Sequence, residues 1–172
     1  DRRKPDLGMD RRVKRMQRRY LMALAGAGSA VMLLGAFGFQ YIGGLAPCAM
    51  CLWQRWPHAV AVALGALGFA LPHAVVAVAG AVSMLTGAGI ALLHTGVERE
   101  WWTLNLACTG GGEDLGAMDM ATLLDPTIGE AIVLCTEVAW SMLGLSMASW
   151  NGIASLVLMG LWIAAARAPS DR

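Results

Sequence analysis

Residues 21–42 read LMALAGAGSAVMLLGAFGFQYI, an apolar stretch without a charged side chain. A helix that crosses the roughly 30 Å hydrocarbon core of a membrane needs about 20 such residues. Because that core offers no water to backbone groups, apolar segments of this length should be helical. Three more follow along the chain: one from near Cys48 to Leu71, residues 73–95, and one from near Ser149 to Ala166. The sequence predicts an all-α membrane protein, a four-transmembrane-helix bundle with a long loop between spans three and four.

The composition agrees with a membrane protein. Hydrophobic residues make up 57% of the 172 residues, and only 15% are charged, whereas a soluble domain is about 25% charged. Nine of the thirteen Lys and Arg lie in the first nineteen residues, where they act as a topology signal and can contact anionic lipid. We see no charged tract that favours nucleic acid.

The Lys and Arg distribution also predicts the orientation. The basic arm, residues 1–19, precedes the first span, whereas the loop 96–149 carries one such residue, Arg99. Positive residues gather on the cytoplasmic side, so both termini should be cytoplasmic and the connections 43–50 and 96–149 should face outward. We expect one membrane domain, residues 20–166, followed by a short tail, residues 167–172. A cleaved signal peptide is the weaker interpretation, because the first segment is long for one and three more spans follow.

All four cysteines lie in the two outward connections or beside them. Cys48 and Cys51 form a C-x-x-C motif. A helix from Pro57 to Leu71 would be only about 23 Å long, too short to span, so the second helix should begin near Cys48 and carry the motif in its first turn. Pro57 should then kink or loosen this helix, and Leu71-Pro72-His73 should be a tight hairpin.

The position of the motif favours thiol chemistry. A cysteine at a helix N-terminus sees the positive end of the helix dipole, which favours the nucleophilic thiolate. Arg55 follows Cys51 by one turn on the same face and could pair with an anion there, although it could also extend to lipid headgroups. His94 ends the third span at the same depth and could hydrogen-bond a polar headgroup or carry a proton. His58 and His73 are expected to be structural.

The second cysteine pair leaves several possibilities open. Cys108 and Cys135 lie in the long loop, and Gly110-Gly111-Gly112 gives Cys108 freedom to move. Four thiols could exchange disulfides, hold a zinc ion or form two static disulfides. Within this loop, residues 113–124 fit a short amphipathic surface helix or an ordinary polar loop equally well.

Small residues in the spans should allow close helix packing: Gly26, Ala30, Gly65, Gly68, Gly80, Gly87 and Gly89.

The motif PCAMCLWQR at residues 47–55 resembles the signature of the DsbB family, the bacterial inner-membrane disulfide-bond formation proteins. Further matches lie in the third span, the loop and the fourth span: His94-Thr95, Cys108, Cys135, Trp140, Gly144-Leu145 and Trp150. The resemblance covers about residues 20–166. It implies a multi-pass protein of the bacterial inner membrane, with the long loop and all four cysteines on the periplasmic side.

The resemblance also implies a reaction. A periplasmic DsbA-like oxidase of the thioredoxin fold would be re-oxidised by the Cys108–Cys135 disulfide, with Cys108 forming the mixed disulfide. Cys135 and Cys48 would then exchange, and a quinone, either ubiquinone or menaquinone, would regenerate Cys48–Cys51 next to Cys51, Arg55 and His94. Such a DsbA–DsbB–quinone system keeps the bacterial periplasm oxidising. No metal site is expected on this interpretation; a non-enzymatic protein with static disulfides or zinc is the alternative.

Overall fold

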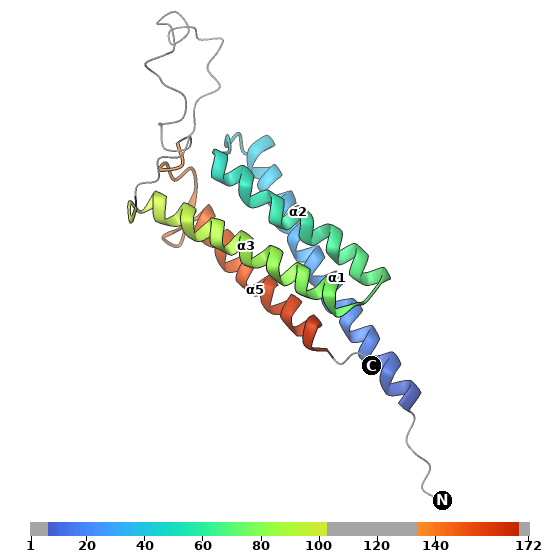
Figure 1. The fold of residues 1–172 in the computed structure, drawn as a ribbon. Coiled ribbons are helices and arrows are strands. Elements are labelled where there is room, and N and C mark those ends of the chain that lie inside the picture. Colours follow the sequence, from blue (N-terminus) through green and yellow to red (C-terminus); the bar gives the residue numbers. More distant parts are fainter. Residues whose placement is uncertain (1–6, 103–133, 169–172) are drawn as a thin grey trace, which may run out of the picture.

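The four long helices of the described residues lie side by side as a bundle (Figure 1). A computed structural model describes residues 7–102 and 134–168. Its helices are α1 (Leu7–Tyr41), α2 (Ala49–Ala70), α3 (Ala74–Glu98) and α5 (Met147–Arg167). α1 packs along α2, and α3 packs along α5 and α2. The N-terminal end of α1 projects beyond the other three helices (Figure 1).

Three of these helices are long and apolar enough to cross a membrane: Arg15–Tyr41, Ala74–Glu98 and Met147–Arg167. The predicted membrane character is therefore confirmed. α2 has 22 residues but carries Gln54, Arg55 and His58 in its N-terminal half, so it is not among the three apolar helices. It lies against α1 and α3, and its role as a fourth span stays a prediction.

The helix boundaries differ from the predicted ones mainly at α1. Residues 7–19, predicted as a separate basic arm, are helical and continuous with the first span. Arg18 anchors this extension to the bundle. Its side chain is buried and donates hydrogen bonds to the carbonyl oxygens of Ala165, Pro72 and Ala168. One guanidinium thus supplies partners for carbonyl groups at the end of α5 and in the α2–α3 turn, where helix ends leave carbonyls without intrahelical partners.

The beginning of α2 agrees with the length argument. Cys48 is the N-cap residue and Cys51 lies in the first turn. Pro57 is inside the helix, as expected, and Ser83 of α3 donates a hydrogen bond to its carbonyl oxygen at 2.9 Å. The chain then reverses between Ala70 and Ala74, which confirms the predicted hairpin.

Small residues allow the helices to approach closely, as the sequence suggested. A methyl group added at Gly26 would lie 2.9 Å from Cα of Gly65 in α2. Gly80 of α3 lies under the indole of Trp162, and an added methyl group would come within 2.2 Å of that ring. The prediction is wrong for Gly89, where a methyl group would have no neighbour within 4 Å among the described residues.

Within the described residues, two separate buried clusters hold the bundle. The larger lies among all four helices and includes Met22, Met84 and Trp162, each without exposed surface. The smaller lies at the other end and consists of Cys48, Met50, Val97 and Cys135. The second cluster brings cysteines from distant parts of the sequence together.

A short β-hairpin, which the sequence did not reveal, precedes α5. β1 (Ser141–Met142) pairs with β2 (Leu145–Ser146) in antiparallel register. The two residues between them, Leu143 and Gly144, have positive φ angles of 55° and 76°, as the tightest hairpin turns require. The side chain of Ser146 then caps α5 by accepting a hydrogen bond from Ser149 N. Cys108 and the predicted surface helix at 113–124 lie outside the described residues.

Candidate redox site

Two thiols lie at the N-terminal end of α2 with their sulfur atoms 2.8 Å apart. Neither forms a disulfide with a cysteine of the described residues. The C-x-x-C spacing produces this proximity, because the N-cap side chain turns back over the first turn. Cys48 Sγ also accepts a hydrogen bond from Cys51 N at 3.2 Å. Such a pair needs only a small rotation of the side chains to form a disulfide.

The environment of Cys48 distinguishes the two thiols. Cys48 is buried, with 4% of its surface exposed, whereas Cys51 is half-buried. The pKa of the Cys48 thiol is raised well above its usual range, first because it donates a hydrogen bond to the Cys51 sulfur and second because it is buried. The first proton to leave the pair therefore does not come from Cys48.

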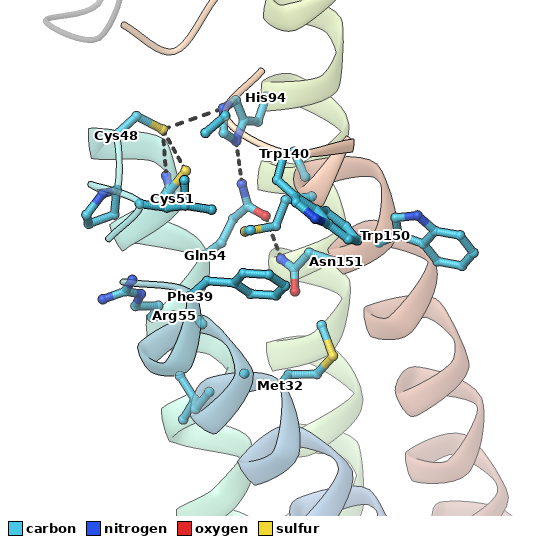
Figure 2. Close-up of a pocket in the computed structure, with 18 of the residues that line it drawn as sticks. Met32, Phe39, Cys48, Cys51, Gln54, Arg55, His94, Trp140, Trp150 and Asn151 are labelled. Atoms are coloured by element: carbon cyan, nitrogen blue, oxygen red, sulfur yellow. Dashed lines mark hydrogen bonds between the residues drawn. The ribbon is translucent and has the colours of Figure 1, made fainter. Parts of the chain in front are cut away.

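His94 of α3 faces the cysteines across the top of the bundle (Figure 2). Its ring is buried, with 3% of its surface exposed. Nε2 lies 3.5 Å from Cys48 Sγ, and Nδ1 lies 2.8 Å from Gln54 Nε2. Because the Gln54 amide nitrogen can only donate, Nδ1 accepts and Nε2 carries the proton. His94 therefore donates a hydrogen bond to the Cys48 sulfur.

This contact is the end of a longer hydrogen-bonded chain. Asn151 Nδ2 of α5 donates to Gln54 Oε1 at 2.5 Å, and its Oδ1 accepts from His58 Nε2 at 2.8 Å. Every donor therefore points the same way, from His58 through Asn151, Gln54 and His94 to Cys48. The opposite direction would place a proton on His58 Nδ1, which is buried without a partner among the described residues and would be costly as an unpaired donor.

A carboxylate lies on the outer side of the same histidine. Glu98 Oε1 is 3.7 Å from His94 Nε2, and both side chains are almost fully buried. The other Glu98 oxygen accepts a hydrogen bond from Ser146 Oγ at the start of α5. The His94 ring is thus fixed from three sides, by Gln54, Cys48 and Glu98.

A cavity of about 370 Å³ opens beside the thiols. Its α1 wall is apolar and contributes Val31, Met32, Ala36 and Phe39. Its other wall carries the two thiols and most of the hydrogen-bonded side chains, and residues from before α2 and α5 lie at its outer rim. The polar wall and the rim include Cys48, Cys51, Gln54, Arg55, His58, His94, Pro47, Trp140, Trp150 and Asn151. An apolar cavity of this size with a few polar groups is typical of a small-molecule site.

Arg55 lines this cavity, but its guanidinium points towards α1 (Figure 2). Arg55 donates a hydrogen bond to Gln40 Oε1 at 2.7 Å, and its charge lies 4.9 Å from the centre of the Phe37 ring. Its hydrogen bond and its ring contact are therefore with α1, and its pairing with an anion beside Cys51 stays a prediction.

Cys135 is fully buried and packs in the same cluster as Cys48, Met50 and Val97. The structure thus brings three of the four cysteines to one end of the bundle. The fourth, Cys108, lies outside the described residues.

Sequence reasoning missed the role of Gln54 and Asn151, and it treated His58 as merely structural. A usable signal was present. All three are polar residues inside apolar helices, where such residues usually face the bundle interior and a functional site.

Comparison with known proteins decides the family. A family profile described as "Disulfide bond formation protein DsbB" matches residues 18–165. The chain belongs to the DsbB family. Relatives named "Disulfide bond formation protein B" include one from Dechloromonas aromatica, 32% identical over 75% of this chain and 80% of its own. Another, from Methylococcus capsulatus, is 32% identical over 77% of this chain and 87% of its own. No solved structure matches the chain.

Membership of the DsbB family makes this chain a membrane oxidoreductase of disulfide-bond formation. The cysteine pair at the start of α2 lies inside the matched residues, as do His94, Cys108 and Cys135.

Proposed function

We propose that this chain re-oxidises a periplasmic DsbA-type dithiol oxidase and passes the electrons to a membrane quinone through two cysteine pairs. The observation that carries the proposal is the position of Cys48 and Cys51. Their sulfurs are 2.8 Å apart and line an apolar cavity of about 370 Å³. A redox-active dithiol beside a lipid-like cavity is what electron transfer to a membrane-soluble acceptor requires.

The cavity residues fit a quinone. The apolar wall of α1 suits a ring with an alkyl tail, and the opposite wall offers polar groups to ring oxygens. His58 lines the cavity, and its Nδ1 is buried without a partner within the described residues. A quinone bound there would accept two electrons and two protons, the same numbers that a dithiol releases on forming a disulfide. Gln54, Arg55, His94 and Asn151 would surround it.

The two cysteine pairs would act in sequence. A thiolate of the partner attacks the Cys108–Cys135 disulfide at Cys108, and the partner's second thiol releases its own disulfide, leaving Cys108 and Cys135 reduced. Cys135 then attacks the Cys48–Cys51 disulfide at Cys48, and Cys108 resolves the resulting bond. Each exchange forms one disulfide and breaks one. The burial of Cys135 beside Cys48 supports the second exchange.

The residues around Cys48 suit this order. Because the pKa of Cys48 is raised, Cys51 is the sulfur that gains negative charge first, and it is also the less buried of the two. Cys51 would therefore face the electron acceptor, while Cys48 exchanges with Cys135. His94, which donates to the Cys48 sulfur, would stabilise negative charge there when Cys48 is the leaving group.

The proposal includes the membrane arrangement. α2 would be the fourth span, with both termini in the cytoplasm of a bacterial inner membrane and residues 96–149 as a periplasmic loop. The polar side chains of α2 would then face the cavity and the other helices rather than lipid, because Gln54 and His58 are buried. The loop would present Cys108 to the soluble partner.

The test is anaerobic mixing of the detergent-solubilised chain with a reduced thioredoxin-fold dithiol oxidase and a quinone, following quinone absorbance. We expect steady quinone reduction. The Cys51→Ser variant should stop turnover although the loop disulfide still accepts one pair of electrons. The Cys135→Ser variant has no loop disulfide and should not re-oxidise the reduced partner. Mixed instead with the oxidised partner, its Cys108 thiol should attack the partner's disulfide and form a partner–Cys108 adduct on a non-reducing gel. An adduct at Cys48, or sustained quinone reduction without Cys51, would contradict the proposal.

A further inference from the structure

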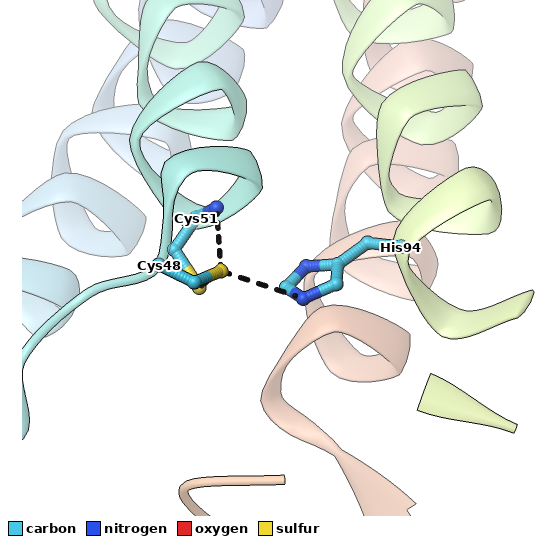
Figure 3. A group of neighbouring side chains, drawn as sticks. All are labelled: Cys48, Cys51 and His94. Carbon is cyan, nitrogen blue, oxygen red and sulfur yellow. Dashed lines mark hydrogen bonds between the residues drawn. The ribbon is translucent and has the colours of Figure 1, made fainter. Parts of the chain in front are cut away.

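The first observation is a group of three metal-binding atoms at the end of α2. Cys48 Sγ, Cys51 Sγ and His94 Nε2 all lie within 4.8 Å of one another (Figure 3). Cys48 and His94 are buried, and Cys51 is half-buried. The atoms come from two helices, α2 and α3, that are already packed together, so the group is held in place by the bundle itself.

We propose that the reduced dithiol, together with His94, binds a thiophilic divalent metal ion such as Zn²⁺ or Cd²⁺. Two thiolates, one imidazole and an open fourth position form a set that zinc uses in known sites. This inference does not rest on the proposed function, because it concerns only the reduced thiols and the imidazole beside them.

The separations are close to those that a metal ion needs. With Zn–S and Zn–N bonds of about 2.3 and 2.0 Å, tetrahedral ligands lie roughly 3.6 Å apart for the S–N pair and 3.8 Å for the S–S pair. Cys48 Sγ and His94 Nε2 are 3.5 Å apart. The two sulfurs, 2.8 Å apart, must separate by about 1 Å, which rotation of the half-buried Cys51 side chain allows.

The charge balance also favours binding at this depth. A divalent ion replaces one proton on each thiol, so two protons leave and the product of M²⁺ with two thiolates and a neutral imidazole carries no net charge. A neutral complex avoids the cost of placing an uncompensated charge in a poorly hydrated site. The fourth position can be filled by water from the cavity that Cys48, Cys51 and His94 line.

One feature of the site opposes binding and provides a sharp test. The proton on His94 Nε2 must move to Nδ1, where Gln54 now donates. Gln54 must therefore turn its amide to accept, as the outer partner of a metal-bound histidine normally does. Gln54→Glu supplies a permanent acceptor at the same place, so it should bind the metal about tenfold more tightly.

The experiment is anaerobic titration of the full detergent-solubilised chain with CdCl₂, read by the thiolate-to-Cd²⁺ charge-transfer band in the ultraviolet. Loop thiols are removed by using the Cys108→Ser/Cys135→Ser variant. We expect one Cd²⁺ per reduced chain, displaced by Zn²⁺, and no binding after Cys48 and Cys51 are oxidised to a disulfide.

Ligand variants in the same background complete the test. His94→Gln should weaken Cd²⁺ binding about 100-fold or more. Losing a metal ligand should reduce the affinity at least as much as losing a group that hydrogen-bonds such a ligand. His94→Cys, which restores a soft ligand, should bind again and also guards against a misfolded His94→Gln chain. Retention of full affinity in His94→Gln would overturn the proposal. So would the loss of binding in the Cys108→Ser/Cys135→Ser background, because it would indicate a four-cysteine site instead.

Discussion

Replacing Asn151 tests most clearly the series of hydrogen bonds that runs from His58 to Cys48. Asn151→Leu keeps the approximate shape of the side chain but removes both of its hydrogen bonds. Gln54 Oε1 then loses its donor, and His58 Nε2–H loses its acceptor. An unmade hydrogen bond at a buried group costs about 1–3 kcal/mol, so the two together should cost about 2–6 kcal/mol.

The loss should be visible in thermal unfolding of the detergent-solubilised chain. For a chain of this length, about 1 kcal/mol lowers Tm by about 2–4 °C, so we expect Asn151→Leu to lower Tm by about 4 °C or more. A second readout follows His94 itself. ¹⁵N NMR of the imidazole should show a proton on Nε2 in the parent chain and a mixture of tautomers in the variant, because the Gln54 amide is then free to turn.

Thr86→Val is the matched control. Thr86 is exposed and its hydroxyl donates only to Val82 O of its own helix, so its replacement should leave Tm and the His94 tautomer unchanged. If Asn151→Leu also left Tm and the His94 tautomer unchanged, the hydrogen bonds from His58 through Asn151 and Gln54 would not hold His94. Their assignment as the support of the site would then be wrong.

Three other changes test separate parts of the account. Arg55→Ala should raise the KM for quinone and leave disulfide exchange with the partner unchanged. Arg55→Lys should restore the KM only in part, because the planar fork of the guanidinium is lost. Equal kinetics in the parent chain and both variants would leave Arg55 without a role in the cavity. Cys51 raises the pKa of Cys48, so Cys48 should remain protonated above pH 9.0, the ordinary thiol pKa. Cys51→Ala should shift the titration of the Cys48 thiolate absorbance to lower pH. An unshifted titration would show that Cys51 does not raise the pKa of Cys48. Gly80→Leu should lower Tm by clashing with the bundle interior, whereas Gly89→Leu should not; similar losses in both variants would count against the packing described.

The helical architecture was accessible from the sequence because lipid imposes a simple rule. Apolar runs of the right length must be helices, and the hairpin at Leu71–His73 follows from a proline between two such runs. The length argument also placed Cys48 and Cys51 at the first turn of α2, because a helix starting at Pro57 would be too short. These inferences use only local composition and helix geometry.

The support of the site could not be derived in the same way. The hydrogen bonds that hold His94 join residues 40 and 97 positions apart in the sequence, and such pairings depend on how α2, α3 and α5 are rotated against one another. Arg55 shows the same limit. Helical spacing places it below Cys51, but its long side chain turned to Gln40 and Phe37 on α1, which spacing along α2 does not reveal.

Cys48 and Cys51 are proposed to deliver electrons directly to a quinone. The most direct measurement is a single turnover of the Cys108→Ser/Cys135→Ser variant, in which these are the only thiols. The reduced variant is mixed anaerobically with quinone, without any protein partner, and quinol and free thiols are counted. We expect one quinol formed and both thiols lost per chain, with neither change after Cys51→Ser. Unreduced quinone in the parent variant, or equal quinol formation after Cys51→Ser, would contradict it.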